Sequence, residues 1–285
     1  MILVQPDDFD PQLLDSKTPL HFYEETVSVS EKTIDSKRNI LLVNWNEDTH
    51  LILRDLKEYL APGSSVDIAL SSDKLSNIDE VAIKKQLNIV RDFIVEDDFT
   101  QDFFRKVGLD KYNSIVLLSD NIIPDINMSN LSDAKSMITL LQIRLVLKEL
   151  NKNNIPVVSQ IQNPKNKDLM DTKNSYTDVI ISNKLIGNYT CMLAENPRLQ
   201  KVFNEILQPD GSEFYIRDIE DYILPDSAIN FYTLVKSGVK RNDLILGYKI
   251  ESEESEENHG IYINPKKSKE IKFSKGDKVI VLAEN

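Results

Sequence analysis

Acidic residues follow two predicted strands and could together hold a divalent cation. Asp97 and Asp98 come soon after the strand predicted at Asn88–Phe93. Asp120 follows the strand predicted at Ser114–Leu118. The loops at the carboxyl ends of parallel strands meet at one edge of a sheet, so these three carboxylates can converge. Calcium prefers clustered carboxylate and carbonyl oxygens, so Ca²⁺ or another divalent cation is the ligand that such a cluster predicts.

Two of these acids have a second interpretation, as helix caps. Asp97 and Asp98 precede a helix predicted at Phe99–Val107. Negative charge and side-chain acceptors stabilise the first turn of a helix, because its N–H groups have no partner within the helix. Capping is the interpretation that we favour for these two residues.

A nucleotide is the second candidate ligand, and the segment Asn39–Gly63 suggests it. The apolar run Ile40–Val43 predicts a strand buried on both faces, and the apolar spacing after it predicts a helix. This order opens a dinucleotide-binding fold, but the turn lacks the glycines that let a backbone approach a pyrophosphate. We therefore expect the fold without a standard nucleotide site. The candidate cofactor contacts are Asn44, Trp45, Asn46, Asp73 and Asp120.

Patterns typical of catalysis are absent from the sequence. There is no nucleophile elbow, no Walker loop and no paired Ser, His and Asp spacing. The three histidines are widely separated, which argues against a His/Cys metal site. Cys191 lies in a predicted helical stripe and is expected in the core rather than as a nucleophile. Trp45 is expected to pack. We expect no enzymatic activity.

The composition indicates a protein of a reducing, aqueous compartment. Its 34 basic and 46 acidic residues give a net charge of −12, which argues against a nucleic-acid binder and repels anionic membrane surfaces. The single cysteine fits a reducing compartment. No apolar run approaches the length of a membrane span, and the N-terminus does not resemble a signal peptide. We expect a cytoplasmic location.

Strands and helices alternate along residues 39–182, which predicts an α/β domain with a Rossmann-like parallel sheet and helices on both faces. Six runs are predicted as its strands: Ile40–Val43, Val66–Leu70, Asn88–Phe93, Ser114–Leu118, Ile155–Ile161 and Val179–Ile181. A long helix is predicted at Leu131–Leu150, after a loop at Asn121–Asn130. Apolar residues occupy more than one side of this helix, which is typical of deep burial or of a subunit contact.

Three further segments complete the predicted organisation. Residues 1–38 are predicted as an arm or linker with one edge strand near Phe22–Val29. Residues 183–211 are predicted as two crossover helices. Residues 212–285 are predicted as a small α+β lobe, in which the acidic run 251–258 forms an exposed hairpin loop. The second crossover helix has an apolar stripe that can pack on the chain's own sheet or cross to a second subunit, formed by Leu199, Val202, Phe203, Ile206 and Leu207.

Several motifs, taken in order, resemble the CASTOR/POLLUX ion-channel family. They are ILLVNW at 40–45, YLAPGS at 59–64, DAKSMITLLQIR at 133–144, SNKLIGNYTCMLAENPRLQKVFNEIL at 182–207 and LILGYK at 244–249. A Rossmann lobe, a helical crossover and a small α+β lobe in this order resemble an RCK domain. RCK domains are the TrkA-like regulators of conductance found below potassium channels and in Trk-type uptake systems. The resemblance covers residues 39–285.

The resemblance implies a regulatory domain that couples ligand or ion binding to a cation channel. It implies assembly with copies of itself, as a dimer or as part of a larger ring, with the stripe at 199–207 embracing the neighbouring subunit. The other implied partner is a pore domain or an upstream RCK domain, to which residues 1–38 would connect. The membrane would then be reached only through the pore subunit. The turn departs from the family, since Asn44 replaces a glycine and Glu47 and Asp48 replace basic residues.

Two other functions stay open at this point. An NAD(H)-binding Rossmann protein, or a related oxidoreductase, would need the glycine-rich turn that the segment Asn39–Gly63 lacks. A protein-binding scaffold could use the acidic run 251–258 as its contact surface. The regulatory channel domain is the function that we favour.

Overall fold

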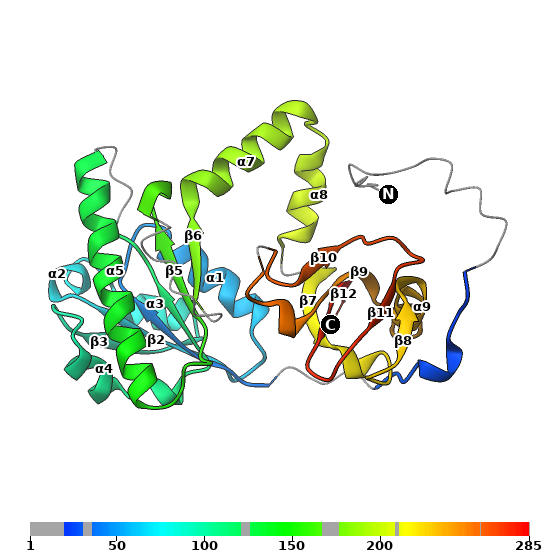
Figure 1. The fold of residues 1–285 in the computed structure, drawn as a ribbon. Coiled ribbons are helices and arrows are strands. Elements are labelled where there is room, and N and C mark those ends of the chain that lie inside the picture. Colours follow the sequence, from blue (N-terminus) through cyan, green and yellow to red (C-terminus); the bar gives the residue numbers. More distant parts are fainter. Residues whose placement is uncertain are drawn as a thin grey trace. The chain divides into compact units, whose positions relative to one another are not determined.

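The chain divides into two compact units, drawn as a ribbon in Figure 1. The Rossmann unit is Asp35–Gln200, and the C-terminal unit is Lys201–Asn285 together with Met1–Ile34. The computed structural model describes residues 20–30, 36–120, 126–166, 177–208, 211–256 and 258–284. Predictions that concern residues 1–19 or 121–125 lie outside the described residues.

A six-stranded parallel sheet forms the centre of the Rossmann unit, in the order β3-β2-β1-β4-β5-β6. Its strands are β1 (Asn39–Val43), β2 (Ser65–Leu70), β3 (Val90–Val95), β4 (Ser114–Leu117), β5 (Val157–Ile161) and β6 (Thr177–Ile181). All six predicted strands are present. Residues 40–43 are buried, as expected for a strand covered on both faces. The direction of strand order reverses between β1 and β4, the place at which such folds bind ligands.

Helices cover both faces of this sheet (Figure 1). They are α1 (Thr49–Tyr59), α2 (Ser72–Leu75), α3 (Glu80–Gln86), α4 (Gln101–Val107) and α5 (Ile126–Glu149). One apolar core joins the sheet to Leu53 of α1 and Ile83 of α3. The other core joins it to Phe104 of α4 and Ile143 of α5. The predicted fold class is confirmed.

The structure corrects one predicted element. α5 begins at Ile126, inside the segment Asn121–Asn130 that the sequence predicts as a loop. The polar segment Ser71–Gln86 contains two short helices, α2 and α3. Capping explains the start of α3, because the Asp79 side chain accepts a hydrogen bond from the N–H of Ala82.

Two helices follow the sheet, α7 (Ser182–Glu195) and α8 (Leu199–Ile206). None of their residues is buried within this chain. The expectation that Cys191 lies in the core is therefore wrong: Cys191 is exposed, because its stripe faces no core of its own chain. Along the chain, the boundary between the two units falls between Gln200 and Lys201, inside α8. The sequence predicts a separate segment over 183–211.

Beyond α8, the described part of the C-terminal unit contains two antiparallel sheets and the helix α9. The larger sheet contains, in order, β10 (Ile261–Ile263), β9 (Leu244–Lys249), β12 (Lys278–Ala283) and β7 (Glu213–Asp218). The smaller sheet pairs β11 (Glu270–Lys272) with β8 (Ala228–Asn230). Their core includes Phe231 of α9 (Phe231–Arg241), Tyr222, Tyr248 and Phe273. β8 and β11 were absent from the predicted elements because three residues are too few to show an alternating pattern.

The acidic run 251–258 connects β9 to β10, as the sequence predicts. It begins with a single 3-10 turn, Glu251–Glu253. Lys249 pairs with Glu251 at 3.4 Å and also contacts Glu254. The loop is therefore partly ion-paired, and its charges are not all turned to solvent.

Residues 20–30 lie against the C-terminal unit (Figure 1). They contain one 3-10 turn, Glu24–Thr26, and one isolated antiparallel bridge between Val27 and Ile223. The edge strand predicted near Phe22–Val29 is reduced to this bridge because the turn interrupts the extended backbone. No helix in the described part of the chain combines the length and the hydropathy of a membrane-spanning segment.

Candidate functional site

A cavity of about 1210 Å³ lies at the carboxyl ends of strands β1 to β4 in the Rossmann unit. The structure brings every predicted ligand residue to its lining: Asn44, Trp45, Asn46, Asp73, Asp97, Asp98 and Asp120. This agrees with the general rule for ligand sites in doubly wound sheets. Sequence reasoning did not find Lys74 and Lys135, two cationic residues of the same lining.

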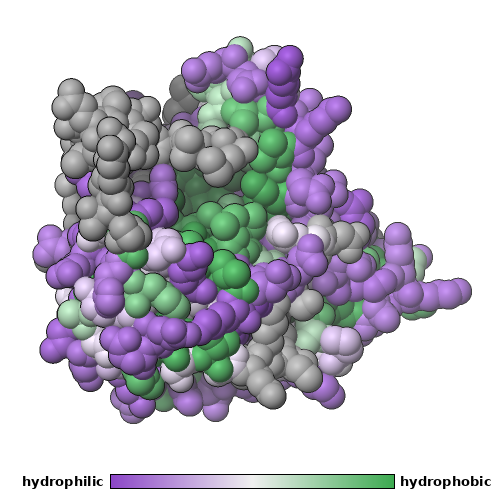
Figure 2. All heavy atoms as spheres, turned by 90° about the vertical axis from the view of Figure 1, so that its right-hand side faces the viewer, coloured by the Kyte–Doolittle hydropathy of each residue, from purple (hydrophilic) through white to green (hydrophobic). Residues whose placement is uncertain are grey.

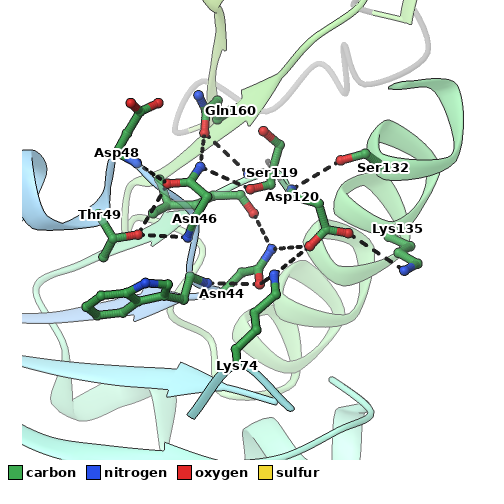
Figure 3. A network of polar contacts seen from close by, with 12 residues as sticks. Asn44, Asn46, Asp48, Thr49, Lys74, Ser119, Asp120, Ser132, Lys135 and Gln160 are labelled. Atoms are coloured by element: carbon green, nitrogen blue, oxygen red, sulfur yellow. Dashed lines mark hydrogen bonds and ion pairs between the residues drawn. The ribbon is translucent and has the colours of Figure 1, made fainter. Parts of the chain in front are cut away.

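Asn44 sits where β1 ends and takes the role that glycine has in related turns. Its φ is +78°, in the left-handed region that asparagine tolerates better than most side chains. Its backbone N–H donates to the carbonyl of Ala69 at 2.7 Å. Its Nδ2 donates to the carbonyl of Leu118 at 3.0 Å and to Oδ1 of Asp120 at 3.2 Å (Figure 3). The turn after β1 is thereby fastened to the turn after β4.

Asn46 binds the N-terminus of α1, the end of the helix at which dinucleotide-binding folds hold a pyrophosphate. Its side chain is buried, and its Oδ1 accepts from the N–H of Asp48 at 3.1 Å and from Oγ1 of Thr49 at 3.2 Å. Its Nδ2 donates to the carbonyl of Ser119 and to Oε1 of Gln160, each at 3.1 Å (Figure 3). An anion at the N-terminus of α1 would have to displace this side chain and break these bonds.

Lys74 of α2 reaches across the cavity to the same turns. Its Nζ donates to Oδ1 of Asn44 at 2.5 Å and to Oδ1 of Asp120 at 2.6 Å (Figure 3). Nζ of Lys135, on α5, lies 3.7 Å from Oδ2 of Asp120. Of the three carboxylates predicted to hold a divalent cation, Asp120 therefore binds the ammonium group of Lys74. One feature of the sequence could have indicated this contact: Lys74 directly follows Asp73, in the segment after the second strand.

The charge state of Asp120 follows from these contacts. Burial opposes ionisation, but the hydrogen bonds from Lys74 and Asn44 and the charges of Lys74 and Lys135 outweigh it. Together they lower the pKa of Asp120 below its usual range. Asp120 is therefore a carboxylate whose charge the chain itself compensates.

Asp97 caps a helix, although a different one from that predicted. Its Oδ1 accepts from the backbone N–H of Ser72 at 2.7 Å and from the hydroxyl of Ser72 at 2.8 Å, at the start of α2. These two bonds lower the pKa of Asp97. α4 is capped instead by Thr100, whose Oγ1 accepts from the N–H of Phe103 at 3.3 Å. The prediction that Asp97 and Asp98 cap α4 is therefore wrong, because Thr100 directly precedes its first turn.

The remaining predicted residues line the cavity with looser contacts. Asp73 lies on α2, and a hydrogen bond from Ser71 lowers its pKa. Trp45 is half-buried and packs against the core of β1 and β2, with its ring edge-on to His50 at a centroid distance of 5.1 Å. Trp45 is thus mainly a packing residue, as expected.

The acids do not form an evident metal centre. Among the described residues, no three His, Cys, Asp or Glu side chains lie close enough to hold a metal ion together. Asp97 and Asp120 line one cavity with Asp98, but both already accept hydrogen bonds from protein groups. Calcium binding at Asp97, Asp98 and Asp120 stays a prediction.

The fold that carries this cavity is similar to that of a solved structure. No family model matches the sequence. The structure is similar to that of the human SLO3 gating ring, with a TM-score of 0.56 over 87% of this chain and 44% of that chain. At 13% sequence identity this likeness concerns the fold alone, which is similar to that of a gating ring.

The sequence comparisons point to particular relatives. The chain is 23% identical to the "Probable ion channel CASTOR" of Oryza sativa subsp. japonica over 87% of its length, and 25% identical to the "Probable ion channel POLLUX" of Arabidopsis thaliana over 86%. It is 22% identical to the ion channel CASTOR of Lotus japonicus over 87%. The chain spans about a third of the length of these relatives, 31%, 33% and 32%. The resemblance to the CASTOR/POLLUX channels is confirmed.

Proposed function

We propose that this chain is the regulatory domain of a CASTOR/POLLUX-like cation channel, in which occupancy of the cavity is coupled to ion transport. The observation that carries the proposal is sequence similarity to ion channels along 86–87% of the chain, in a fold similar to a gating ring. The domain reaches the membrane through the pore part of the channel. The proposed role is regulatory rather than enzymatic, because the relatives are named as ion channels.

Coupling requires a ligand that binds two arrangements of the protein with unequal free energy. The contact that a ligand can change is the pair between Lys74 and Asp120, which joins α2 to the end of β4. A cation that took the place of the ammonium group would keep Asp120 compensated while releasing α2. We therefore favour a cation over an anion as the regulating ligand.

Self-assembly is the second part of the proposal. Val202 of α8 is 39% exposed, and Leu207, directly after α8, is 66% exposed. In β7, Phe214 is 55% and Ile216 is 64% exposed, on the outer face of the sheet in the C-terminal unit. Figure 2 shows hydrophobic residues gathered between hydrophilic ones on one face of the molecule. Exposed apolar area of this kind marks contact surfaces. The stripe on α8 of one copy packs on this sheet face of its partner.

Substitutions on α8 test the assembly. Phe203→Asp combined with Leu207→Asp should yield monomers in light scattering, because two charges would enter an apolar contact. The matched control is Gln200→Asp with Asn204→Asp, which adds the same two charges to exposed positions of the same helix and should leave assembly intact. Unchanged assembly of the first variant would contradict the crossover contact.

The alternative function is NAD(H) binding. One observation favours it: the cavity lies where the direction of strand order reverses, which is where dinucleotides bind in folds of this kind. The buried side chain of Asn46 argues against it, because it already accepts a hydrogen bond from the N–H of Asp48, next to the start of α1, where a pyrophosphate would bind. Titration with NADH, followed by nucleotide fluorescence, should give no saturable change. Saturable binding that Asp73→Ala weakens would favour the alternative.

A further inference from the structure

The arm at residues 20–30 forms a continuous set of backbone contacts with the C-terminal unit. The N–H groups of Ser28 and Ser30 donate to the carbonyls of Tyr222 and Asp221, each at 3.2 Å. The N–H of Leu224 donates back to the carbonyl of Thr26 at 2.8 Å. With the bridge between Val27 and Ile223, these bonds form a short antiparallel pairing with the segment 221–224.

Side chains of α9 fasten the start of the arm. Nδ2 of Asn230, which caps α9, donates to the carbonyl of His21 at 2.8 Å. The N–H of Tyr23 donates to Oγ1 of Thr233 at 3.2 Å, and its ring packs against the core of the unit. The pairing is thus extended by contacts whose partners lie more than two hundred residues away in the sequence.

Arg241 fastens the end of the arm from inside the unit. Its side chain is buried, and its Nε donates to Oδ2 of Asp243 at 3.2 Å. Its Nη1 donates to the carbonyl of Ser30 at 2.5 Å and to the hydroxyl of Ser30 at 3.0 Å. Hydrogen bonds from a charged group are the stronger kind, so this is the firmest point of the contact.

The order of the chain gives this contact its consequence. The arm precedes the Rossmann unit, yet it packs on the unit that follows it. The Rossmann unit is therefore joined to the C-terminal unit at both of its ends, at residue 35 through the docked arm and at residue 200 through α8. Release of the arm would leave α8 as the remaining link between the Rossmann unit and residues 201–285.

We propose that residues 20–30 are a releasable docking segment that binds segment 221–224 and the start of α9, and that its docking restrains motion of the Rossmann unit. The contact can open without unfolding either unit, because residues 20–30 add one isolated bridge, hydrogen bonds and the ring of Tyr23 to the C-terminal unit but no strand to its sheets. This inference goes beyond the proposed function, because it holds whether or not the chain regulates a channel.

Proline substitutions in the full chain test the docking. Ser28→Pro with Ser30→Pro removes the two N–H donors and also the Ser30 hydroxyl, which accepts a hydrogen bond from Arg241. Both Arg241 and Asp243 themselves stay in place. Val29→Pro is the matched control, because the structure describes no hydrogen bond from the N–H of Val29, which lies between them. In hydrogen exchange the amide of Leu224 should exchange at least about tenfold faster in the double variant than in the control. Equal rates in the two variants would overturn the docking.

Spin labels test the restraint. Cysteines are placed at Lys85 on α3 and Val239 on α9, both exposed, in a Cys191→Ser background. Labelled protein is diluted with unlabelled protein, so that only distances within one chain are measured. The distance distribution should be broader in the Ser28→Pro, Ser30→Pro variant than in the Val29→Pro variant. If the Leu224 amide exchanges fast in the double variant but its distance distribution is no broader than that of the Val29→Pro variant, the restraint is overturned.

Discussion

Lys74 shows how one side chain can replace a ligand. The predicted cation ligands converge, but the nearest positive charge to Asp120 is the ammonium group 2.6 Å from its Oδ1. The pair is less than one third exposed, so solvent screens it only in part. The sequence could predict that Asp120 lies at the edge of the sheet, because loops at the carboxyl ends of parallel strands meet there. It could not place Lys74 against it, because the contact joins residues 46 positions apart through a particular side-chain conformation.

Removing the Lys74 charge should cost stability. We expect Lys74→Met to lower the free energy of unfolding by about 1–2 kcal/mol, because Asp120 loses a charged hydrogen bond. Lys135→Met removes the same charge from a side chain that is 66% exposed and 3.7 Å away, and should cost less than about 1 kcal/mol. Urea denaturation measures both. Added calcium should raise the free energy of unfolding of Lys74→Met more than that of the wild type. Equal losses of stability in Lys74→Met and Lys135→Met would contradict this role of Lys74.

Asp67, like Asp120, is a carboxylate whose charge is stabilised by neighbouring side chains. It lies in β2 with 3% exposure, and it accepts from Nε of Arg91 at 2.8 Å and from the hydroxyl of Tyr112 at 2.7 Å. Burial opposes ionisation, but the hydrogen bonds from Arg91 and Tyr112 outweigh it and lower the pKa of Asp67. A lowered pKa means that ionised Asp67 stabilises the folded chain at neutral pH.

The contribution of Asp67 should depend on pH in a defined window. We expect Asp67→Asn to lower the free energy of unfolding by about 1–3 kcal/mol at pH 7. The difference from the wild type should hold down to the unfolded pKa of about 4 and shrink below it, as Asp67 becomes protonated in the folded chain. Asp92→Asn is the control, because its pair with Lys84 is exposed at the surface. A difference that grew on acidification would contradict this account.

At the scale of elements, continuous apolar runs were the reliable signals. Four consecutive apolar residues in β1 could be predicted as a buried parallel strand because no other element tolerates that pattern so well. Short or capped elements could not be predicted in the same way. β8 has three residues, and α4 is capped by Thr100 rather than by the acids that precede it. Caps depend on φ and ψ at one residue, which composition does not reveal.

At the scale of the whole molecule, the contact of the arm is the feature that the sequence could not predict. The bond between Arg241 and Ser30 joins residues 211 positions apart, and neither residue lies in a recognisable motif. The arm was expected to be a linker, since its prolines and scattered acids resemble one. Local pattern therefore predicts the two folded units, but it does not predict which unit holds the segment before them.

The exposure of Cys191 has a consequence for handling the protein. The chain has one cysteine, so any disulfide that forms between copies of it must link two molecules at the same position on α7. Such a bond needs the two Cα atoms within about 7 Å, so its formation would report that two α7 helices can meet side by side. Air oxidation would also trap that pairing covalently, and a reductant in the buffer keeps such a product from being mistaken for native assembly.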